Sequence, residues 1–221
     1  MKSVLFLGKK NDVFTSRALA FCKKNFKNIE FYLGDRDSSF NDKVFSWKGD
    51  YIVSYLFPKK IPNSILKNSR LLALNFHPGT PDYPGIGCTN YAIYNKESEF
   101  GATCHIINQK IDSGPIISVE KFKVSKNETL ISLTNKTYSI MYKMFIKIIT
   151  KILDNRTIKQ SNKIKWKGKP KTRKDFANFL KMDLNMSKKE MINRIKATTY
   201  PNYQSAYLEV NGLKFFAKIH E

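Results

Sequence analysis

The sequence predicts an α/β protein with a mostly parallel sheet, flanking helices and a small C-terminal module of one helix and a β-hairpin. Short apolar runs recur through the first half of the chain, as they do in buried strands. Segments of helical periodicity lie between several of these runs, which favours parallel pairing. Near the C-terminus, Asn211-Gly212 joins two short apolar segments, a pattern typical of a hairpin with a type I′ turn.

Five strands are expected in the main sheet, because each of five short apolar runs lies between helical or turn-like segments. They cover residues 3–7, 29–33, 51–56, 71–76 and 102–107. A helix is expected between the first two strands, over residues 15–26, where apolar side chains recur at near-helical spacing. The expected architecture is a Rossmann-like sheet, and such sheets bind ligands beyond the carboxyl ends of their strands.

A long amphipathic helix is predicted from about Leu130 to Ile152, opened by the capping-box pattern Ser125-Lys-Asn-Glu128. A polar, lysine-rich connector follows over about residues 155–172 and indicates a boundary. Two parts are therefore expected, a catalytic domain and a C-terminal module: residues 1–165 and residues 166–221.

Within the module, Ser187-Lys-Lys-Glu190 repeats the capping box and predicts a short helix that reaches Lys196. The hairpin after it is apolar and would be marginal in water by itself, so we expect it to pack on the main domain or on a second subunit.

The two faces of the hairpin differ. One face is expected to be buried against the main domain and carries Leu213, Phe215, Ala217 and Ile219. Phe216 lies on the other face without an obvious cover. Pairing two hairpins about a twofold axis would bury Phe216 and satisfy an open strand edge. A homodimer through residues 203–221 is therefore predicted, with a hairpin folded within the monomer as the alternative.

Composition argues against several classes of protein, but it does not identify a binding partner. Lys and Arg outnumber Asp and Glu by 39 to 18, for a net charge of +21, which would attract any polyanion. The excess is nearly all lysine and is spread along the chain, as biased genomic composition would also produce. Three cysteines without a Cys-x-x-Cys pair predict neither a disulfide scaffold nor a metal site. No apolar stretch would span a bilayer and no segment resembles a signal peptide, so a cytoplasmic location is expected.

A dinucleotide cofactor is not expected. Gly34-Asp35 after the second strand could mimic the acidic residue that binds a ribose in dinucleotide-binding folds. The Gly-x-Gly-x-x-Gly turn that should precede it is absent, because the first strand ends in Gly8-Lys-Lys-Asn-Asp. Gly85-Ile-Gly87 alone is too weak a pattern to predict a phosphate loop.

A cluster of polar side chains is predicted where the fourth strand ends. Asn75 and His77 are two residues apart in an extended segment, so both project to one side. Asp112 follows the fifth strand in a tight loop, and it can close on His77 if the two strands are neighbours. A lone histidine is more often structural than catalytic, but an Asn beside it at the carboxyl end of a strand removes most of that difference.

Such a cluster suits acyl transfer to an amine. An amide N–H and an imidazolium can stabilise the oxyanion of a tetrahedral intermediate. The attacking nitrogen must lose a proton, which the imidazole or the carboxylate can take directly or through a water. No Ser or Cys nucleophile is required, so the cluster is compatible with direct transfer.

Four segments then identify a family. They are Asn75-Phe-His77-Pro-Gly79, Pro81-Asp-Tyr83-Pro-Gly85, Gly101-Ala-Thr103-Cys-His105 and Asp112-Ser-Gly-Pro-Ile-Ile117. In order and spacing they resemble the folate-dependent formyltransferase family over residues 1–117. The resemblance implies that Asn75, His77 and Asp112 form the catalytic triad and that 10-formyltetrahydrofolate donates the formyl group. It also implies that Thr103 helps to hold a water against Asp112, whereas His105 is interpreted as structural.

The same resemblance implies a pterin pocket formed by the segment after the third strand and by the loop before Asp112, largely through backbone groups. The corresponding residues are Tyr55, Leu56, Phe57, Pro58 and Ile61 in the first segment, and Asn108, Gln109, Lys110 and Ile111 in the second.

The acceptor implied by the resemblance is a nucleotide-linked amino sugar. Relatives that act on phosphoribosylglycinamide carry a Gly- and Asn/Ser-rich turn after the first strand, which this chain lacks. Relatives that act on initiator methionyl-tRNA usually have Ser-Leu-Leu-Pro in the loop after the histidine. Nucleotide-sugar N-formyltransferases have His-Pro-Gly and are commonly dimers. The expected acceptor is dTDP-4-amino-4,6-dideoxy-D-glucose, for O-antigen and lipopolysaccharide synthesis.

Loops at the carboxyl edge of the sheet are expected to bind this acceptor through Lys9, Lys10, Gly79 and Tyr83. Positive charge from Lys9 or Lys10 suits a diphosphate. Two solvated lysines and a packing tyrosine would fit the sequence equally well.

Two other functions stay open. One is a purine-pathway formyltransferase acting on phosphoribosylglycinamide. The other is a non-enzymatic, basic RNA-binding module, against which the intact set of Asn75, His77 and Asp112 argues. Neither a membrane nor a nucleic acid is expected as a partner.

Overall fold

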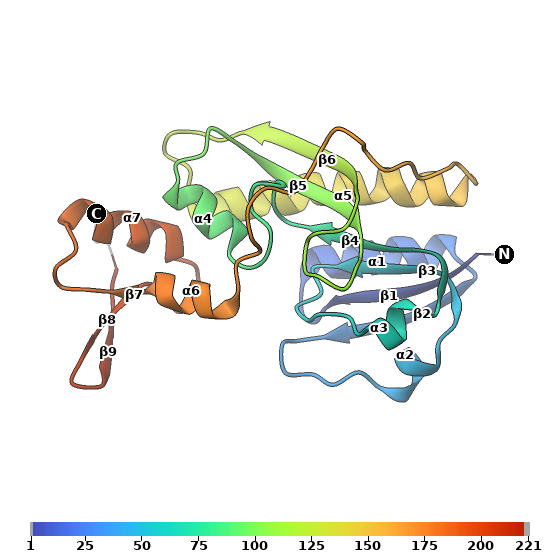
Figure 1. The fold of residues 1–221 in the computed structure, drawn as a ribbon, viewed down its shortest axis with the longest axis horizontal. Helices are drawn as coiled ribbons and strands as arrows, with labels where there is room; N and C mark the ends of the chain where they lie inside the picture. The colour runs from blue at the N-terminus through green and yellow to red at the C-terminus, as the bar shows by residue number, and fades with distance from the viewer. Residues whose placement is uncertain (1, 219–221) are drawn as a thin grey trace.

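The computed structural model describes residues 2–218, and a six-stranded sheet in the order β2-β1-β3-β4-β5-β6 forms its centre (Figure 1). Neighbouring strands from β2 to β4 pair in parallel, and the pairs β4–β5 and β5–β6 are antiparallel. The mostly parallel sheet is therefore confirmed. The strands are β1 (Ser3–Lys9), β2 (Asn28–Gly34), β3 (Gly49–Tyr55), β4 (Ser69–His77), β5 (Glu99–Ile106) and β6 (Ile116–Lys123).

Strand β6 is the one strand of this sheet that the sequence pattern did not predict. It lies at the sheet edge next to β5, and most of its side chains are half-buried or exposed. Its apolar pattern is correspondingly weak, because an edge strand needs fewer buried residues than a central one.

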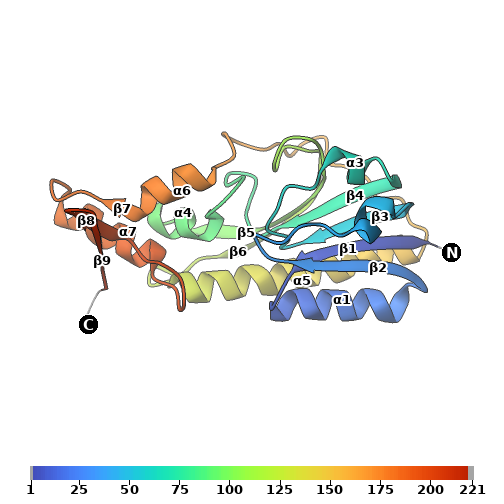
Figure 2. The same ribbon diagram turned by 90° about the horizontal axis from the view of Figure 1, so that it is seen from below.

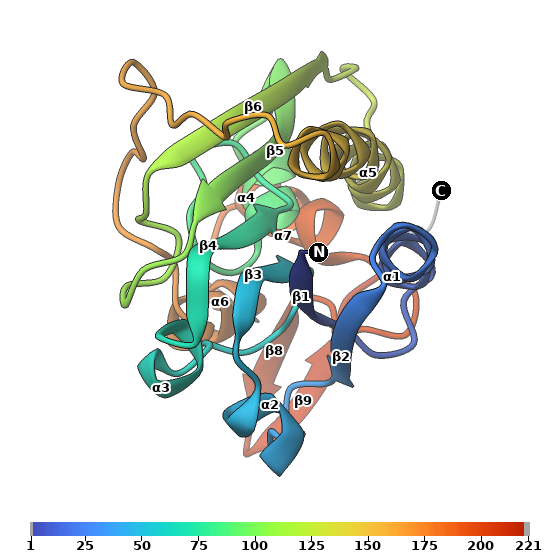
Figure 3. The ribbon, with the colours of Figure 1, turned by 90° about the vertical axis from the view of Figure 1, so that its right-hand side faces the viewer.

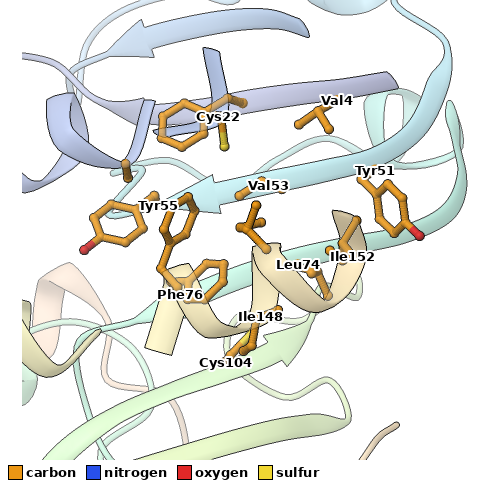
Figure 4. Packing of buried hydrophobic residues seen from close by; sticks show 14 of the residues in the cluster. Val4, Cys22, Tyr51, Val53, Tyr55, Leu74, Phe76, Cys104, Ile148 and Ile152 are labelled. Atoms are coloured by element: carbon orange, nitrogen blue, oxygen red, sulfur yellow. The ribbon is translucent and has the colours of Figure 1, made fainter. Parts of the chain in front are cut away.

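Two helices, α1 (Val13–Asn25) and α5 (Leu130–Leu153), cover one face of the sheet (Figure 2). They bury the larger apolar cluster against the strands, and Figure 4 shows part of it around Phe76 and Ile148. The opposite face buries a second cluster under the short helices α2 (Asp42–Ser46) and α3 (Asn63–Leu66). Both faces of the central strands are thus covered, as expected for a parallel sheet.

The first predicted capping box is wrong in its position. The N-cap of α5 is Thr129, whose side chain accepts from the Ser132 N–H. Glu128 accepts from the Ser125 N–H at 3.3 Å in a turn that closes before the helix begins. Ser187 does cap its helix, as predicted, but the complete capping box of the C-terminal module is formed by Thr172 and Asp175.

Up to residue 218, the C-terminal module contains two helices and a three-stranded sheet in the order β7-β8-β9. Asn211 (φ 50°) and Gly212 (φ 78°) turn β8 into β9 in the left-handed conformations of a type I′ turn, which confirms the predicted hairpin. The elements are α6 (Arg173–Leu180), β7 (Lys181–Met182), α7 (Lys188–Thr198), β8 (Tyr207–Val210) and β9 (Leu213–Phe216).

The expected burial of one hairpin face against the main domain is wrong. Leu213 is 63% exposed and Phe215 is 55% exposed. The cause is geometric, because the hairpin projects away from the six-stranded sheet (Figure 1). Phe216 is 47% exposed, and its ring lies 5.8 Å from that of Tyr207. Ile219, which the prediction placed on the buried face, lies outside the described residues.

The connector between α5 and α6 is docked on the main domain along its length. The backbone N–H of Ser161 donates to the Ile116 carbonyl on β6, and that of Lys167 donates to the Pro81 carbonyl. Figure 3 shows the segment passing β6 on its way to α6. The predicted division between residues 165 and 166 falls inside this docked segment and stays a prediction.

Candidate active site

The site is built where β4 ends. Antiparallel pairing with β5 sets Asn75 opposite His105 and His77 opposite Thr103. Residues opposite one another on neighbouring strands project from the same face, so these four side chains meet. Asp112 reaches them from the loop between β5 and β6. The expected pairing of the two strands, and with it the approach of Asp112 to His77, is confirmed.

His77 and Asp112 form a buried pair. His77 Nδ1 lies 3.2 Å from Asp112 Oδ2, and the two side chains are 4% and 9% exposed. His77 Nε2 lies 2.9 Å from the Tyr83 carbonyl oxygen. Both partners can only accept, so both ring nitrogens donate, and the protonation assigned from these partners is that of an imidazolium.

Charge pairing governs the titration of both groups. Burial disfavours the charged form of His77, but the Asp112 carboxylate outweighs burial and raises the pKa of His77 well above its usual value. Burial also opposes ionisation of Asp112, yet the charge of His77 and hydrogen bonds from His105 and His77 lower the pKa of Asp112 well below its usual range. The pair is therefore charged at neutral pH.

His105 is part of the same cluster, although the sequence reading treated it as structural. Its Nε2 lies 3.2 Å from Asp112 Oδ1 and 3.1 Å from Asn75 Nδ2. Its Nδ1 donates to the Ile106 carbonyl at 2.9 Å. Asp112 thus faces one imidazole at each carboxylate oxygen. The alternation of side chains along the strand predicts that His105 lies on the same face as Thr103. Only the register of β5 against β4 shows that His105 lies opposite Asn75.

Thr103 and Gly79 shape the turn beneath His77. Thr103 Oγ1 donates to the Gly79 carbonyl at 2.7 Å. A Cβ on Gly79 would lie 2.7 Å from His77 Nε2, so only glycine fits below the ring. The water-holding contact predicted between Thr103 and Asp112 stays a prediction.

Two residues at the site have backbone conformations that are uncommon for non-glycine residues. Leu56 (φ 52°) and Asp112 (φ 41°) lie in the left-handed region, where strain tends to mark functional positions. The Gly85 N–H donates to Asp112 Oδ2 at 2.8 Å. A Cβ on Gly85 would lie 2.3 Å from the Lys171 carbonyl oxygen, so the connector packs directly on this loop.

A cavity of about 770 Å³ opens on the cluster, a size that suits a small-molecule site. Tyr55 and Gln109 do not line it. Strand alternation turns Ser54 and Leu56 toward the cavity and Tyr55 into the core, where its ring lies 5.2 Å from that of Phe145. The predicted pterin residues that line the cavity are Leu56, Phe57, Pro58, Ile61, Asn108, Lys110 and Ile111.

The cavity is lined by many more cations than anions. Among the described residues its acidic lining consists of Asp37 and Asp112, whereas its basic lining consists of Lys9, Arg36, Lys59, Lys60, Lys110, Lys171 and Arg173. Sequence reasoning missed Lys171 and Arg173, because their position depends on how the connector docks. Arg173, the first residue of α6, donates to the Pro58 carbonyl at 2.9 Å and so joins the end of the connector to the loop after β3.

Of the four residues predicted to bind the acceptor, Lys9 lines the cavity. Lys10, Gly79 and Tyr83 do not. The Tyr83 ring packs 5.7 Å from that of Phe100, and its hydroxyl donates to Glu97. Tyr83 contributes its backbone carbonyl to His77 instead.

The profile of one protein family, described as Formyl transferase, matches residues 12–149, more than half of the chain. The chain belongs to this family. The resemblance expected from the four motif segments is thereby confirmed. A second profile, described as an N-formyltransferase dimerization C-terminal domain, matches residues 175–220 of the formyltransferase.

Curated relatives are similar to this formyltransferase over most of its length. The bifunctional polymyxin resistance protein ArnA of Wigglesworthia glossinidia brevipalpis is 27% identical over 210 residues, which cover 90% of the chain and 29% of the relative. A methionyl-tRNA formyltransferase of Staphylococcus epidermidis is 27% identical over 187 residues, which cover 82% of the chain and 58% of the relative. The chain thus spans less than two thirds of either relative.

Solved structures share the fold along nearly the whole chain. A sugar N-formyltransferase from a Shewanella species has a TM-score of 0.78 at 18% identity, with 98% of this chain and 97% of that chain covered. A 4-N formyltransferase from Francisella tularensis has a TM-score of 0.74 at 22% identity, with the same coverage of 98% and 97%. An N-formyltransferase from Helicobacter canadensis, in complex with folinic acid and dTDP-3-aminofucose, has a TM-score of 0.72 at 23% identity, with 97% and 86% covered. At these identities the likeness establishes the fold.

Within residues 2–218, no group of three or more His, Cys, Asp or Glu side chains is arranged to hold a metal ion. The cysteines Cys22, Cys88 and Cys104 are unpaired and buried, and burial raises the pKa of Cys22 to about 12. No helix in this part of the chain is long and apolar enough to cross a bilayer.

Proposed function

We propose that this formyltransferase transfers a formyl group from 10-formyltetrahydrofolate to the amino group of a nucleotide-linked amino sugar. The expected acceptor is dTDP-4-amino-4,6-dideoxy-D-glucose, in cytoplasmic synthesis of O-antigen or lipopolysaccharide. The observation that carries the proposal is the charged His77–Asp112 pair beside Asn75, which opens on a cavity of about 770 Å³. This pair supplies a positive charge for an oxyanion and a carboxylate for an amine proton.

The cavity suits a folate as formyl donor. Leu56, Phe57 and Ile61 supply apolar surface beside the catalytic cluster, as a flat pterin ring requires. Lys59 and Lys60 lie on the same loop and suit the carboxylates at the other end of a folate. We therefore assign the loop after β3 to the formyl donor.

Each polar side chain has a role that its contacts permit. Asn75 Nδ2 donates to the formyl oxygen as it gains negative charge. The His77 imidazolium stabilises the same charge through Nε2–H, which the Tyr83 carbonyl and the formyl oxygen then share. Asp112, ionised at neutral pH, takes the proton of the attacking amine directly or through a water. Thr103 donates its own proton to Gly79, so toward that water its hydroxyl oxygen acts as an acceptor.

The basic side of the cavity suits the diphosphate of the acceptor. Lys9, Lys171 and Arg173 bring positive charge from β1, from the connector and from the start of α6 to one cavity. A methionyl-tRNA acceptor is the second candidate, because the Staphylococcus epidermidis relative is a methionyl-tRNA formyltransferase and a net charge of +21 suits nucleic acid.

We further propose that the C-terminal module pairs two copies of the chain. Val210, Leu213 and Phe215 leave large apolar surface exposed on the hairpin, and β9 is an edge strand of its sheet. The match to a dimerization domain profile supports the same assembly. A twofold pairing of hairpins would bury this surface and the open edge together.

The experiment that tests the activity offers the protein a choice of acceptors. Mixtures with 10-formyltetrahydrofolate would contain dTDP-4-amino-4,6-dideoxyglucose, a dTDP-3-amino sugar, phosphoribosylglycinamide or initiator methionyl-tRNA. We expect the dTDP-4-amino sugar to gain the mass of one formyl group. Formylation of the tRNA alone would favour the second candidate, and no product with any acceptor would reject formyl transfer to these amines.

A further inference from the structure

A tryptophan from the connector packs edge-to-face against both imidazoles of the site. The ring of Trp166 is 5.5 Å from that of His77 at an interplanar angle of 76°, and 5.0 Å from that of His105 at 89°. Its indole Nε1–H donates to the Gly114 carbonyl at 2.8 Å. Trp166 is half-buried and does not line the cavity.

These contacts join three parts of the site that are separate in sequence. His77 belongs to β4, His105 belongs to β5, and Gly114 lies two residues after Asp112 in the loop between β5 and β6. A Cβ on Gly114 would lie 1.8 Å from the Ile106 carbonyl oxygen, so this turn is packed tightly on β5. One side chain therefore touches both histidines and the backbone next to the carboxylate.

The segment that carries Trp166 is itself held on both sides. Before it, the Ser161 N–H donates to the Ile116 carbonyl. After it, the Lys167 N–H donates to the Pro81 carbonyl, and Lys171 exchanges backbone hydrogen bonds with Pro84 and Ile86 in the loop between His77 and α4. Trp166 is thus fixed relative to the strands, although its segment is otherwise polar and exposed.

Hydrogen bonds from both nitrogens select one of the two orientations of an imidazole about its second side-chain torsion, but the energy well of that torsion is broad, so the ring can still rock within it. An aromatic ring packed at right angles against the imidazole removes much of that freedom. Catalytic geometry is sensitive to such freedom, since small misplacements lower turnover.

We propose that Trp166 is a positioning residue for formyl transfer, which holds the His77 and His105 rings and the Asp112 turn in one arrangement. The inference rests on the proposed function for its kinetic test. Trp166 acts through the imidazoles, because it lines no part of the cavity. The charged and titratable groups that meet around these rings are His77 of β4, His105 of β5, Asp112 of the following loop and Cys88 at the start of α4.

Two substitutions separate the roles of the indole. Trp166→Phe keeps an aromatic ring near the imidazoles and removes the N–H donated to Gly114, whereas Trp166→Leu removes both. We expect Trp166→Leu to lower kcat by about ten- to a hundred-fold with little change in KM for the formyl donor, and Trp166→Phe to recover much of the loss. Trp47→Phe is the matched control, because Trp47 packs against Gly49 away from the cavity and should leave kcat unchanged.

Fluorescence tests the contact without any substrate, so that its outcome is independent of the proposed function. The chain has two tryptophans, and in Trp47→Phe the emission comes from Trp166 alone. A protonated imidazole in contact quenches indole emission, so adding His77→Asn and His105→Asn to this background should brighten it near neutral pH. Folding of every variant is checked by circular dichroism.

Unchanged emission after removal of both histidines would overturn the inference, because the indole would then not contact a charged imidazole. Wild-type kcat in a folded Trp166→Leu variant would also overturn it. If Trp166→Leu does not fold, the fluorescence comparison still decides.

Discussion

Two regions of this formyltransferase depart from the usual rule that polar side chains are exposed and apolar side chains are buried. One region buries polar side chains, and the other exposes apolar ones. At the end of β4, His77, His105 and Asp112 are polar or charged and almost fully buried. In the C-terminal hairpin, Leu213, Phe215 and Phe216 are apolar and exposed. Buried charges and exposed apolar patches are the two arrangements that a stable monomer has least reason to keep. Each therefore marks a surface or site that meets something else.

The buried cluster and the exposed hairpin differ in how they are stabilised. The buried cluster is satisfied internally, because every nitrogen and oxygen of the His77–Asp112 pair has a protein partner within hydrogen-bonding distance. The apolar side chains of the hairpin are covered only in part within the described residues of this chain, since Leu213, Phe215 and Phe216 stay 63%, 55% and 47% exposed. The first region is thus complete within one copy, and the second is expected to be completed by a partner copy.

The largest effect should come from breaking the buried pair. His77→Asn or Asp112→Asn removes one half of the charge pair that we propose serves the oxyanion and the amine proton. We expect turnover to fall by about two or more orders of magnitude in each variant. Steady-state formylation assays measure the loss, with Asp37→Asn as the control because Asp37 lines the cavity outside the cluster. Near-normal turnover in both variants would remove the pair from the mechanism.

The pH dependence of kcat tests the charge of His77. Because Asp112 raises the pKa of His77, the imidazolium persists at neutral pH and is lost only as the pH rises through that raised value. We expect activity to fall on the alkaline side, above the ordinary histidine pKa of about 6.5. In Asp112→Asn the carboxylate charge that raises the pKa of His77 is absent. The fall of any residual activity with rising pH should therefore begin at a lower pH than in the wild-type protein. An alkaline limb that Asp112→Asn does not move would assign the titration to another group.

Substitutions in the hairpin test whether its exposed apolar side chains form a dimer interface. Placing a charge in its apolar surface with Phe215→Lys or Phe216→Lys should shift sedimentation at micromolar concentration from a dimer to a monomer of 25.6 kDa. Leu71→Lys is the control, since Leu71 is exposed on β4, far along the chain from the hairpin. A wild-type monomer, or a dimer that neither substitution alters, would exclude this interface.

The smallest effect is expected at the edge of the cavity. Lys9 lines the cavity and its neighbour Lys10 does not. Lys9→Ala should therefore raise KM for the nucleotide sugar by about two- to five-fold, the size expected for one solvated ion pair, and Lys10→Ala should leave it unchanged. Equal effects of the two substitutions would mean that the lysines act through general charge.

Much of the fold and the centre of the site follow from local patterns. Alternation along β4 puts Asn75 and His77 on one face, and Asn211-Gly212 specifies its turn, so both could be predicted from a few residues. Strand β6 was missed because its edge position leaves its pattern half polar. Tyr55 was assigned to the pterin segment, but its place in the strand alternation turns it into the core.

The remaining residues of the site depend on contacts between distant segments. The position of His105 requires the β4–β5 register, which no single strand encodes. Trp166 and Lys171 lie in a segment whose lysine content is typical of a linker, and Arg173 begins the helix that follows it. Only the docking of this segment against the loop after His77 brings them to the site. The exposure of Phe215 depends on the direction in which the module leaves the main domain.

The transfer itself can be followed most directly with a labelled formyl group. The protein is mixed with 10-formyltetrahydrofolate that carries ¹³C in the formyl carbon and with dTDP-4-amino-4,6-dideoxyglucose, and ¹³C NMR spectra are recorded over time. We predict that the wild-type protein moves the label from the folate to an amide on the sugar nitrogen, and that Asp112→Asn under the same conditions leaves it on the folate. Label that stays on the folate with wild-type protein, that appears only as formate, or that reaches the sugar equally fast with Asp112→Asn would contradict the account.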